Sequence, residues 1–269
     1  MYKILALDLD GTLTNSKKEI TPQTLDILTQ VQQKGLRIVL ASGRPTQGIM
    51  PLANQLHLKD YRGFIMAFNG GLIIDCTTGE AIYRQVLDPS VYKHLYEVGN
   101  TEDFKILSYK DGCMACEDIE NEYVRYAANL NKMKLKKLNN FLDEINFPEP
   151  KCLIVGNEQK LAHLEKDLAE YYQGKINIYR SEPFFLEVLP LGIDKAKRLE
   201  FLLNHLGIKR EELMVCGDGY NDLGMIEYAG LGIAMANAQA IVKEAADYIT
   251  LSNEEDGVAA AVKKFTDLN

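Results

Sequence analysis

Asp8-Leu9-Asp10-Gly11-Thr12-Leu13-Thr14 follows directly on the short apolar run Ile4–Leu7. An apolar run of this length between polar residues predicts a buried strand of a parallel sheet. Asp8 and Asp10 are two positions apart, so their carboxylates leave an extended chain on the same side, at the strand end where α/β sheets bind ligands. Two such close anions repel unless a cation neutralises them, and oxygen ligands favour Mg2+. Because Gly11 also permits a sharp turn, the stretch predicts a metal-assisted carboxylate site.

Two simpler interpretations of this stretch stay open at this point. Asp8, Asp10 and Glu19 match positions 1, 3 and 12 of a calcium-binding loop. However, Leu13 stands where that loop requires glycine, and a strand-like run precedes it instead of a helix. The two acids are equally compatible with an ordinary solvated strand end. The choice therefore depends on the rest of the chain.

The composition is that of an ordinary soluble globular protein, because 46% of the 269 residues are apolar and 25% are charged. The length allows one large domain or two of moderate size. A net charge of −8 argues against nucleic acid or an anionic membrane as the main partner. No apolar run approaches the ~20 residues of a membrane span. Met1-Tyr2-Lys3 leads straight into the first strand, so we expect no signal peptide and a cytoplasmic protein, which suits five cysteines, an odd number.

A strand–helix–strand unit follows the first loop. Thr21 and Pro22 predict the start of a helix that ends at Gly35, and residues 36–41 form the next buried strand. This order requires parallel strands and a right-handed crossover. The second strand ends in Ser42-Gly43-Arg44-Pro45, where a hydroxyl and backbone amides at a helix start can bind an anion. Ser42 alone is equally compatible with a simple helix cap.

A third strand and a hairpin complete this segment. The strand Phe64–Phe68 ends in Asn69-Gly70-Gly71. The runs 72–75 and 81–83 flank Thr77-Thr78-Gly79, which predicts the hairpin.

The pattern changes from about Leu87. Asp111-Gly112 lies between two alternating runs, 104–109 and 113–116, and is a strong hairpin signal. Cys113 and Cys116 have C-x-x-C spacing, but no second cysteine or histidine pair nearby completes a zinc site, so we expect them to alternate along a strand. Two helical stretches are expected next. They are followed by a strand at 151–155, a helix at 159–172 and strands at 176–180 and 184–189, an order that favours an α+β unit with an antiparallel sheet.

The parallel pattern returns after Pro190. Lys195 lies near the start of a helix, and the strand Leu213–Cys216 ends in Gly217-Asp218-Gly219-Tyr220-Asn221-Asp222. This loop is not a dinucleotide fingerprint, because its third glycine is missing. We therefore predict an α/β fold in which residues 1–86 and 187–269 form a doubly wound, Rossmann-like parallel sheet core. Residues 87–186 form an inserted α+β domain.

Three acidic or anion-binding loops and one lysine thus lie at strand ends or helix starts of one parallel sheet. They supply carboxylates for a metal, donors for an anion and an ammonium group for charge balance. This is the equipment for phosphoryl transfer, in which catalysis is mostly positioning and charge stabilisation.

Over essentially its full length the chain resembles the Cof-type phosphatases of the haloacid dehalogenase superfamily. Four segments carry the resemblance in the family's order: Asp8–Leu13, Ser42–Arg44, Lys195 and Gly217–Met225. The insertion between the second and third segments resembles the family's larger α/β cap. Asn69-Gly70-Gly71 also resembles a family loop that faces the substrate.

The resemblance implies a role for each of these residues. Asp8 would be the nucleophile that becomes an aspartyl-phosphate, and Asp10 would protonate the leaving alcohol and then deprotonate the attacking water. Mg2+ would be held by Asp8, Asp218 and the backbone carbonyl of Asp10. The implied ligands of the phosphoryl oxygens are Leu9, Ser42, Gly43, Lys195 and Asn221. The implied supporting residues are Asp222 and Thr12, and the implied substrate-facing residues are Arg44, Asn69 and Gly70.

The expected function is Mg2+-dependent hydrolysis of a small phosphate monoester, with a sugar phosphate as the first choice. Pyridoxal phosphate, flavin mononucleotide and nucleotides stay open as substrates. A phosphomutase would use the same core, and a non-catalytic sugar-phosphate sensor is disfavoured because binding alone needs neither Asp8 nor Asp10. We expect no nucleic-acid or membrane partner, and the sequence leaves the oligomeric state open.

Overall fold

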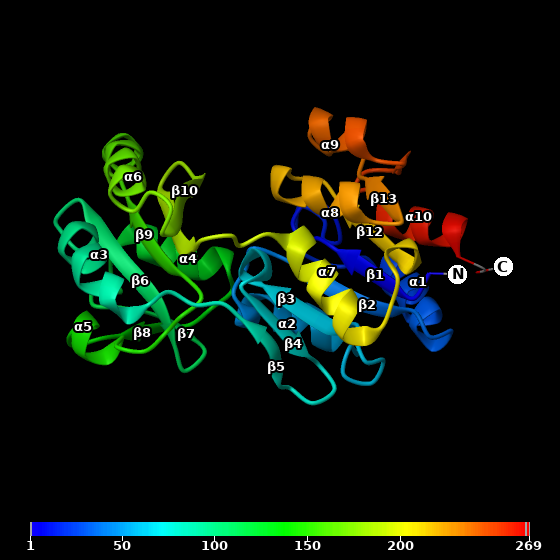
Figure 1. Cartoon of the computed structure of the whole chain (residues 1–269), viewed down its shortest axis with the longest axis horizontal. Coiled ribbons are helices and arrows are strands. Elements are labelled where there is room, and N and C mark those ends of the chain that lie inside the picture. The colour runs from blue at the N-terminus through cyan, green and yellow to red at the C-terminus, as the bar shows by residue number, and fades with distance from the viewer. Residues whose placement is uncertain (1, 267, 269) are drawn as a thin grey trace. The chain divides into compact units, whose positions relative to one another are not determined.

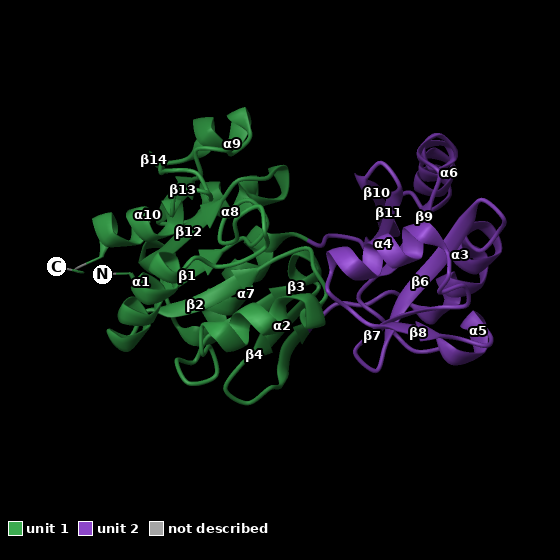
Figure 2. Ribbon diagram, turned by 180° about the vertical axis from the view of Figure 1, so that it is seen from behind, with its two compact units in different colours: residues 1–83, 194–269 green, residues 84–193 purple. Residues whose placement is uncertain are grey.

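A computed structural model describes residues 2–266 and 268, and the chain divides into two compact units. Unit 1 comprises residues 1–83 and 194–269, and unit 2 comprises residues 84–193 (Figure 2). The expected boundaries at 86/87 and 186/187 differ from these by a few residues. The second one falls inside a strand of unit 2, Phe185–Pro190, whose pairing continues to its last residue.

The doubly wound parallel sheet predicted for unit 1 is confirmed. Strands β14 to β3 run parallel, and β4 pairs antiparallel with β3. In their order across the sheet, the strands are β14 (Tyr248–Ile249), β13 (Leu231–Ala234), β12 (Leu213–Gly217), β1 (Ile4–Leu7), β2 (Arg37–Ala41), β3 (Phe64–Ala67), β4 (Leu72–Asp75) and β5 (Ala81–Arg84). The central strands are fully buried, as continuous apolar runs require.

Helices cover both faces of this sheet. Helices α7 and α8 lie on the face toward the viewer in Figure 1, and α1 and α2 lie behind it. The helices of unit 1 are α1 (Pro22–Gln33), α2 (Thr46–Gln55), α7 (Lys195–Leu206), α8 (Leu223–Tyr228), α9 (Ala240–Ala245) and α10 (Gly257–Phe265), with short 3-10 turns η1 (Phe68–Gly70), η3 (Arg210–Glu212) and η4 (Tyr220–Asp222).

Local capping decides where the two long helices start. The Thr21 hydroxyl accepts a hydrogen bond from the Thr24 amide, and Pro22 occupies the first position of α1. The Asp194 carboxylate accepts bonds from the amides of Ala196 and Lys197, so α7 begins at Lys195. The cap therefore determines where the ammonium-bearing side chain of that residue enters the fold.

Unit 2 is an α+β unit around a six-stranded sheet. Its strands, in order across the sheet, are β10 (Ile176–Glu182), β11 (Phe185–Pro190), β9 (Cys152–Gly156), β6 (Phe104–Lys110), β7 (Cys113–Cys116) and β8 (Leu135–Lys137). All neighbours pair antiparallel except β7 and β8. Its helical elements are η2 (Pro89–Val91), α3 (Tyr92–Gly99), α4 (Glu122–Leu130), α5 (Phe141–Glu144) and α6 (Glu158–Tyr171).

A hydrophobic core lies between this sheet and its helices. It includes Leu95 of α3, Phe141 of α5 and Leu161 of α6, which pack with Ile154 of β9. Strand β8 was not expected from the sequence, which suggested only helices between β7 and β9. None of the described helices has the length and apolar character needed to span a membrane.

Candidate active site

The site forms where β1 and its parallel neighbour β12 end. Leu7 is in register with Cys216, so the residues that follow, Asp8 and the Gly217–Asp222 loop, leave the sheet at the same edge. The Asp8 amide donates to the Cys216 carbonyl at 3.1 Å, which holds the two strand ends together. Carboxylates that are far apart in the sequence are therefore brought together by the register of two strands.

Lys195 links two of these carboxylates. Its Nζ donates to Oδ1 of Asp8 and to Oδ1 of Asp222, both at 2.7 Å. Lys195 is 2% exposed and Asp222 is fully buried. A buried ammonium group is stable only when it is paired with an opposite charge. Lys195 is paired with two carboxylates, those of Asp8 and Asp222.

Asp222 also shapes the loop that carries it. Its Oδ2 accepts hydrogen bonds from the amides of Asp218 and Gly219, both at 3.0 Å. Asp218 in turn accepts a bond from the Thr12 hydroxyl at 2.8 Å. Asp222 thus contacts the backbone of the Gly217–Asp222 loop, and Thr12 contacts the carboxylate of Asp218.

The carboxylates repel one another because they carry like charges, and burial strengthens this repulsion. Burial and the charge of Asp222 raise the pKa of Asp8 to about 8, against the opposing effect of Lys195. Burial also raises the pKa of Asp218 to about 6, although the Thr12 hydrogen bond acts to lower it. In Lys195, burial acts to lower the pKa, but the charges of Asp222 and Asp8 outweigh it and raise the pKa.

This donor set fits a hard divalent cation. Oxygen atoms of Asp8, Asp218 and Asp222 all lie within 4.8 Å of one another. Three carboxylates against the single charge of Lys195 leave an excess of negative charge, and carboxylate oxygens are the ligands that Mg2+ prefers. In the described part of the chain, these three residues form the cluster capable of holding a metal.

The loops after β2 and β3 meet the Gly217–Asp222 loop. Oδ1 of Asn69 accepts a hydrogen bond from Nδ2 of Asn221 at 3.1 Å. A Cβ on Gly43 would lie 3.1 Å from Nδ2 of Asn69, so the glycine leaves room for this contact. Ser42 is 3% exposed, and its Oγ accepts a hydrogen bond from the Arg44 amide at 3.1 Å. That turn leaves the hydroxyl hydrogen of Ser42 available for a ligand.

Gly70 and Leu9 were also expected at the site, and the structure shows how each is placed. Gly70 has φ +101°, and a Cβ there would lie 2.5 Å from Cγ of Arg198, so glycine allows α7 to approach this loop. Leu9 directly follows Asp8, and its side chain is fully buried. The site can therefore use only the backbone of Leu9.

The side chain of Asp10 lies outside the three-carboxylate cluster. Arg44 binds it with Nε to Oδ2 at 2.7 Å and Nη2 to Oδ1 at 2.5 Å, and Lys18 Nζ contacts Oδ1 at 2.6 Å. Burial acts to raise the pKa of Asp10, but the two cations outweigh burial and lower it. Arg44, expected to face the substrate, is thus also the main partner of Asp10.

Lys18 was not anticipated from the sequence. It lies in the turn after the first loop with φ +59°, and only that left-handed backbone brings it back toward Asp10. Asn237 was also missed, and its Nδ2 donates to the Gly11 carbonyl at 2.8 Å. No residue pattern marks either contact, because both depend on how the loops fold.

Cys113 and Cys116 lie on β7, as expected. Cys113 is half-buried and Cys116 is buried, and both are free thiols. Burial raises the pKa of Cys116 to about 12, which makes it a poor nucleophile at neutral pH.

Comparisons with known proteins give matches over nearly the whole chain. A family model described as haloacid dehalogenase-like hydrolase matches residues 5–262. The 5-amino-6-(5-phospho-D-ribitylamino)uracil phosphatase YcsE of Bacillus subtilis is 30% identical over 97% of this chain and 94% of its own length. A solved haloacid dehalogenase-like hydrolase from Bacteroides thetaiotaomicron is 51% identical, with a TM-score of 0.97 over 99% of this chain and 100% of its own. The HAD subclass IIB sugar phosphatase BT4131 is 27% identical, with a TM-score of 0.80 over 98% of each chain.

Proposed function

This chain belongs to the haloacid dehalogenase-like hydrolases, and from that membership we propose that it is a Mg2+-dependent phosphatase of small phosphate monoesters. The observation that carries the proposal is the buried contact of Asp8 with Lys195 beside two further carboxylates. A carboxylate in this setting is shielded from water and positioned to attack a phosphorus atom. Asp8 then forms an aspartyl-phosphate, which divides hydrolysis into two easier steps.

Asp10 serves as the general acid and base. In the first step it gives a proton to the leaving alcohol, and in the second it takes one from the attacking water. Before the first step its carboxylate must leave Arg44 and Lys18 and take up a proton from water, because both cations hold it in the ionised form. The contact therefore keeps the acid close to Asp8 but inactive until a substrate arrives.

The phosphoryl group is held by donors from several loops. We assign this role to Lys195, the Ser42 hydroxyl, the side chain of Asn221 and the backbone amides of Leu9 and Gly43. Preorganised donors of this kind stabilise the charge that develops on the transferring group.

Asp8, Asp218 and the backbone carbonyl of Asp10 would hold Mg2+, with Asp222 in support. The ion would supply charge neutralisation for the carboxylates and for the phosphoryl oxygens. Asp222 lies in the same cluster, but its two oxygens are occupied by Lys195 and by loop amides. For that reason we assign it to positioning.

The proposed substrate class is sugar phosphates. The sugar phosphatase BT4131 shares the fold of this protein over 98% of the length of each. YcsE is named for a phosphorylated ribitylamino compound. Pyridoxal phosphate, flavin mononucleotide and nucleotides are the alternatives. We propose that unit 2, residues 84–193, selects the leaving group as a cap domain, and that the enzyme acts in the cytoplasm, where its five free cysteines stay reduced.

A panel of phosphate esters with Mg2+ tests this function. We expect release of inorganic phosphate, fastest from one group of sugar phosphates, and no release from the Asp8→Asn variant. Formation of an isomeric phosphate that depends on a bisphosphate activator would instead identify a phosphomutase. Binding of sugar phosphates without turnover would identify a sensor.

A further inference from the structure

A cavity opens at the end of the core sheet opposite to the strand ends that carry Asp8. Its volume is about 440 Å3, and it is lined by Gln32, Gly35, Arg37, Asp60, Tyr61 and Arg62. Arg37 is the first residue of β2, whereas Ser42 follows its last residue, Ala41. Five strand residues, or roughly 16 Å, separate the two ends. This cavity is therefore distinct from the candidate active site.

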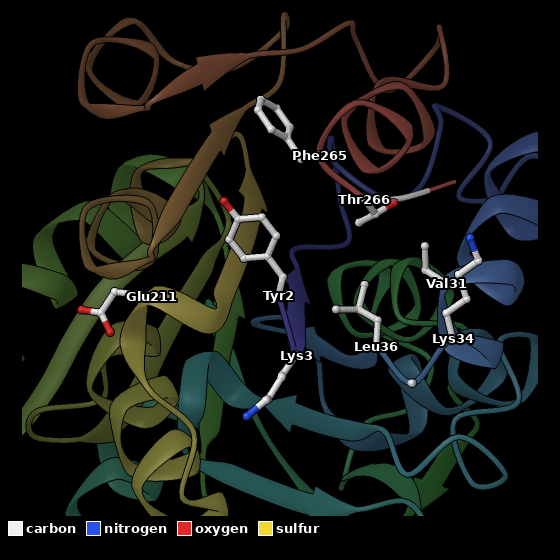
Figure 3. Close-up of a pocket in the computed structure, with 9 residues that line it drawn as sticks. Tyr2, Lys3, Val31, Lys34, Leu36, Glu211, Phe265 and Thr266 are labelled. Atoms are coloured by element: carbon white, nitrogen blue, oxygen red, sulfur yellow. The ribbon is translucent and has the colours of Figure 1, made fainter. Parts of the chain in front are cut away.

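A neighbouring cavity also includes Gly35 in its lining, but its other lining residues are different (Figure 3). That cavity has a volume of about 500 Å3, and the rings of Tyr2 and Phe265 lie at its wall. Its lysines already have partners, because Lys3 forms a salt bridge with Glu212 at 2.8 Å and Lys34 also interacts within the chain. Among the described residues, this cavity is therefore lined by no lysine without a partner.

Arg37 and Arg62 differ from those lysines. Within residues 2–266 and 268, neither guanidinium group forms a salt bridge or a hydrogen bond. Both arginines line the same cavity, and burial and the charge of Arg62 lower the pKa of Arg37 while the carboxylate of Asp75 acts to raise it. Two guanidinium groups beside one cavity form a site for an oxyanion, because each presents a fork of donors that matches phosphate oxygens.

Gln32 and Asp60 also line the cavity. Gln32 is 3% exposed and its Nε2 donates to the Leu56 carbonyl at 3.0 Å, which leaves its Oε1 without a partner among the described residues. Asp60 adds one negative charge, but its carboxylate is 70% exposed and lies 3.6 Å from His57. The carboxylate of Asp75 also acts on Arg37, but among the described residues no carboxylate forms a salt bridge with Arg37 or Arg62, so both guanidinium groups can still bind a ligand.

We propose that this cavity binds a phosphate dianion, either free or carried by a small ester, between Arg37 and Arg62. The site is built entirely from unit 1 and does not depend on the activity proposed for Asp8. A phosphate there would receive charge-assisted hydrogen bonds from both guanidinium groups and remove their mutual repulsion.

The test follows the arginine side-chain Nε–Hε resonances by NMR at constant ionic strength. Inorganic phosphate is titrated into the wild-type protein, and glycerol 3-phosphate into Asp8→Asn protein, which cannot consume it. Arg62→Gly removes one cation without strain, because Arg62 has φ +56°, where glycine is favoured. Arg37→Met removes the other, and Lys59→Met is the matched control, an exposed cation that does not line this cavity.

We expect saturable shifts of the Arg37 and Arg62 resonances, and binding weakened at least about tenfold in Arg62→Gly and in Arg37→Met. The Lys59→Met protein should bind as wild type does. Tighter binding of phosphate would identify free phosphate as the ligand, and tighter binding of glycerol 3-phosphate would identify an ester. Shifts that chloride reproduces, or an unchanged affinity in folded Arg62→Gly protein, would overturn the proposal.

Discussion

Arg44 binds the carboxylate of Asp10 through two hydrogen bonds, Nε to Oδ2 at 2.7 Å and Nη2 to Oδ1 at 2.5 Å. Lys18 adds a third at 2.6 Å. Such charge-assisted bonds stabilise the ionised carboxylate, whereas a general acid must carry a proton when the alcohol leaves. If Asp10 is the general acid that we propose, Arg44 and Lys18 control how readily it takes up its proton.

Replacing Lys18 should change the pH dependence of the reaction. In Lys18→Met the pKa of Asp10 rises, because one of the two cations that lower it is gone while burial remains. The basic limb of the kcat/KM profile for a sugar phosphate should therefore move to higher pH. Lys17→Met is the control, since the Lys17 side chain is exposed and its backbone amide donates to Oδ1 of Asn15. Identical profiles for the two variants would show that Lys18 does not act on Asp10.

The two carboxylates of the first loop should give different kinetic defects. Asp8→Asn should abolish turnover and the covalent intermediate together, because an amide is a poor nucleophile. Asp10→Asn should lose about 10²–10⁴-fold with a sugar phosphate, which needs the proton to leave. With an aryl phosphate it should accumulate phosphoenzyme in rapid-quench experiments, since only the second step then needs Asp10. Covalent phosphate in Asp8→Asn would reverse the assigned roles.

Activity should require Mg2+, with Ca2+ a poor substitute. The proposed ligand set of Asp8, Asp218 and the Asp10 carbonyl is small, which suits the tight octahedral coordination that Mg2+ prefers, whereas the larger Ca2+ accepts more ligands. Phosphate release measured after exhaustive chelation should be lost, and added Mg2+ should restore it. Full activity of the chelated protein would exclude the metal-dependent mechanism.

Gly11→Ala should weaken Mg2+ binding by calorimetry. Gly11 has φ +87°, and a Cβ there would collide with the carboxylate of Asp218. Gly79→Ala is a matched control, because Gly79 has φ +76° and nothing within 4 Å of a Cβ. Both variants carry the strain of a left-handed alanine, about 1 kcal/mol. Only Gly11→Ala should also displace Asp218, the proposed metal ligand. Equal Mg2+ affinities of the two variants would show that Asp218 does not hold the metal.

Glu149→Gln should stabilise the protein above neutral pH. Burial raises the pKa of Glu149 to about 7, with Arg84 3.6 Å away acting to lower it. The pKa of Glu149 in the folded state lies above its unfolded value of 4.5, so the folded state keeps the proton to higher pH. The free energy of unfolding therefore falls as the pH rises from about 4.5 to about 7. Thermal unfolding of Glu149→Gln should lose that dependence. The exposed Glu170→Gln is the control and should retain it.

Much of the fold could be predicted because its signals are local. The apolar runs of β1, β2 and β12 are buried strands as expected, and the caps at Thr21 and Asp194 start helices through contacts with the next few residues. The rule that parallel strands share one functional edge then brings Asp8 and Asp218 together without any knowledge of side-chain positions. The sequence by itself therefore determined the sheet, the edge that carries the site and the family.

Only the tertiary structure decided which partners these side chains meet. Strand β8 escaped prediction because its three residues, Leu135–Lys137, are a strand only through pairing with β7. The contact of Lys18 with Asp10 depends on a left-handed turn, and the shared Lys195 bridge depends on strand register and helix start together. Arg37 and Arg62 are 25 positions apart by number and meet at one cavity only after folding. Periodicity and propensity act over a few residues, whereas these contacts arise from dihedral angles and packing that no short pattern encodes.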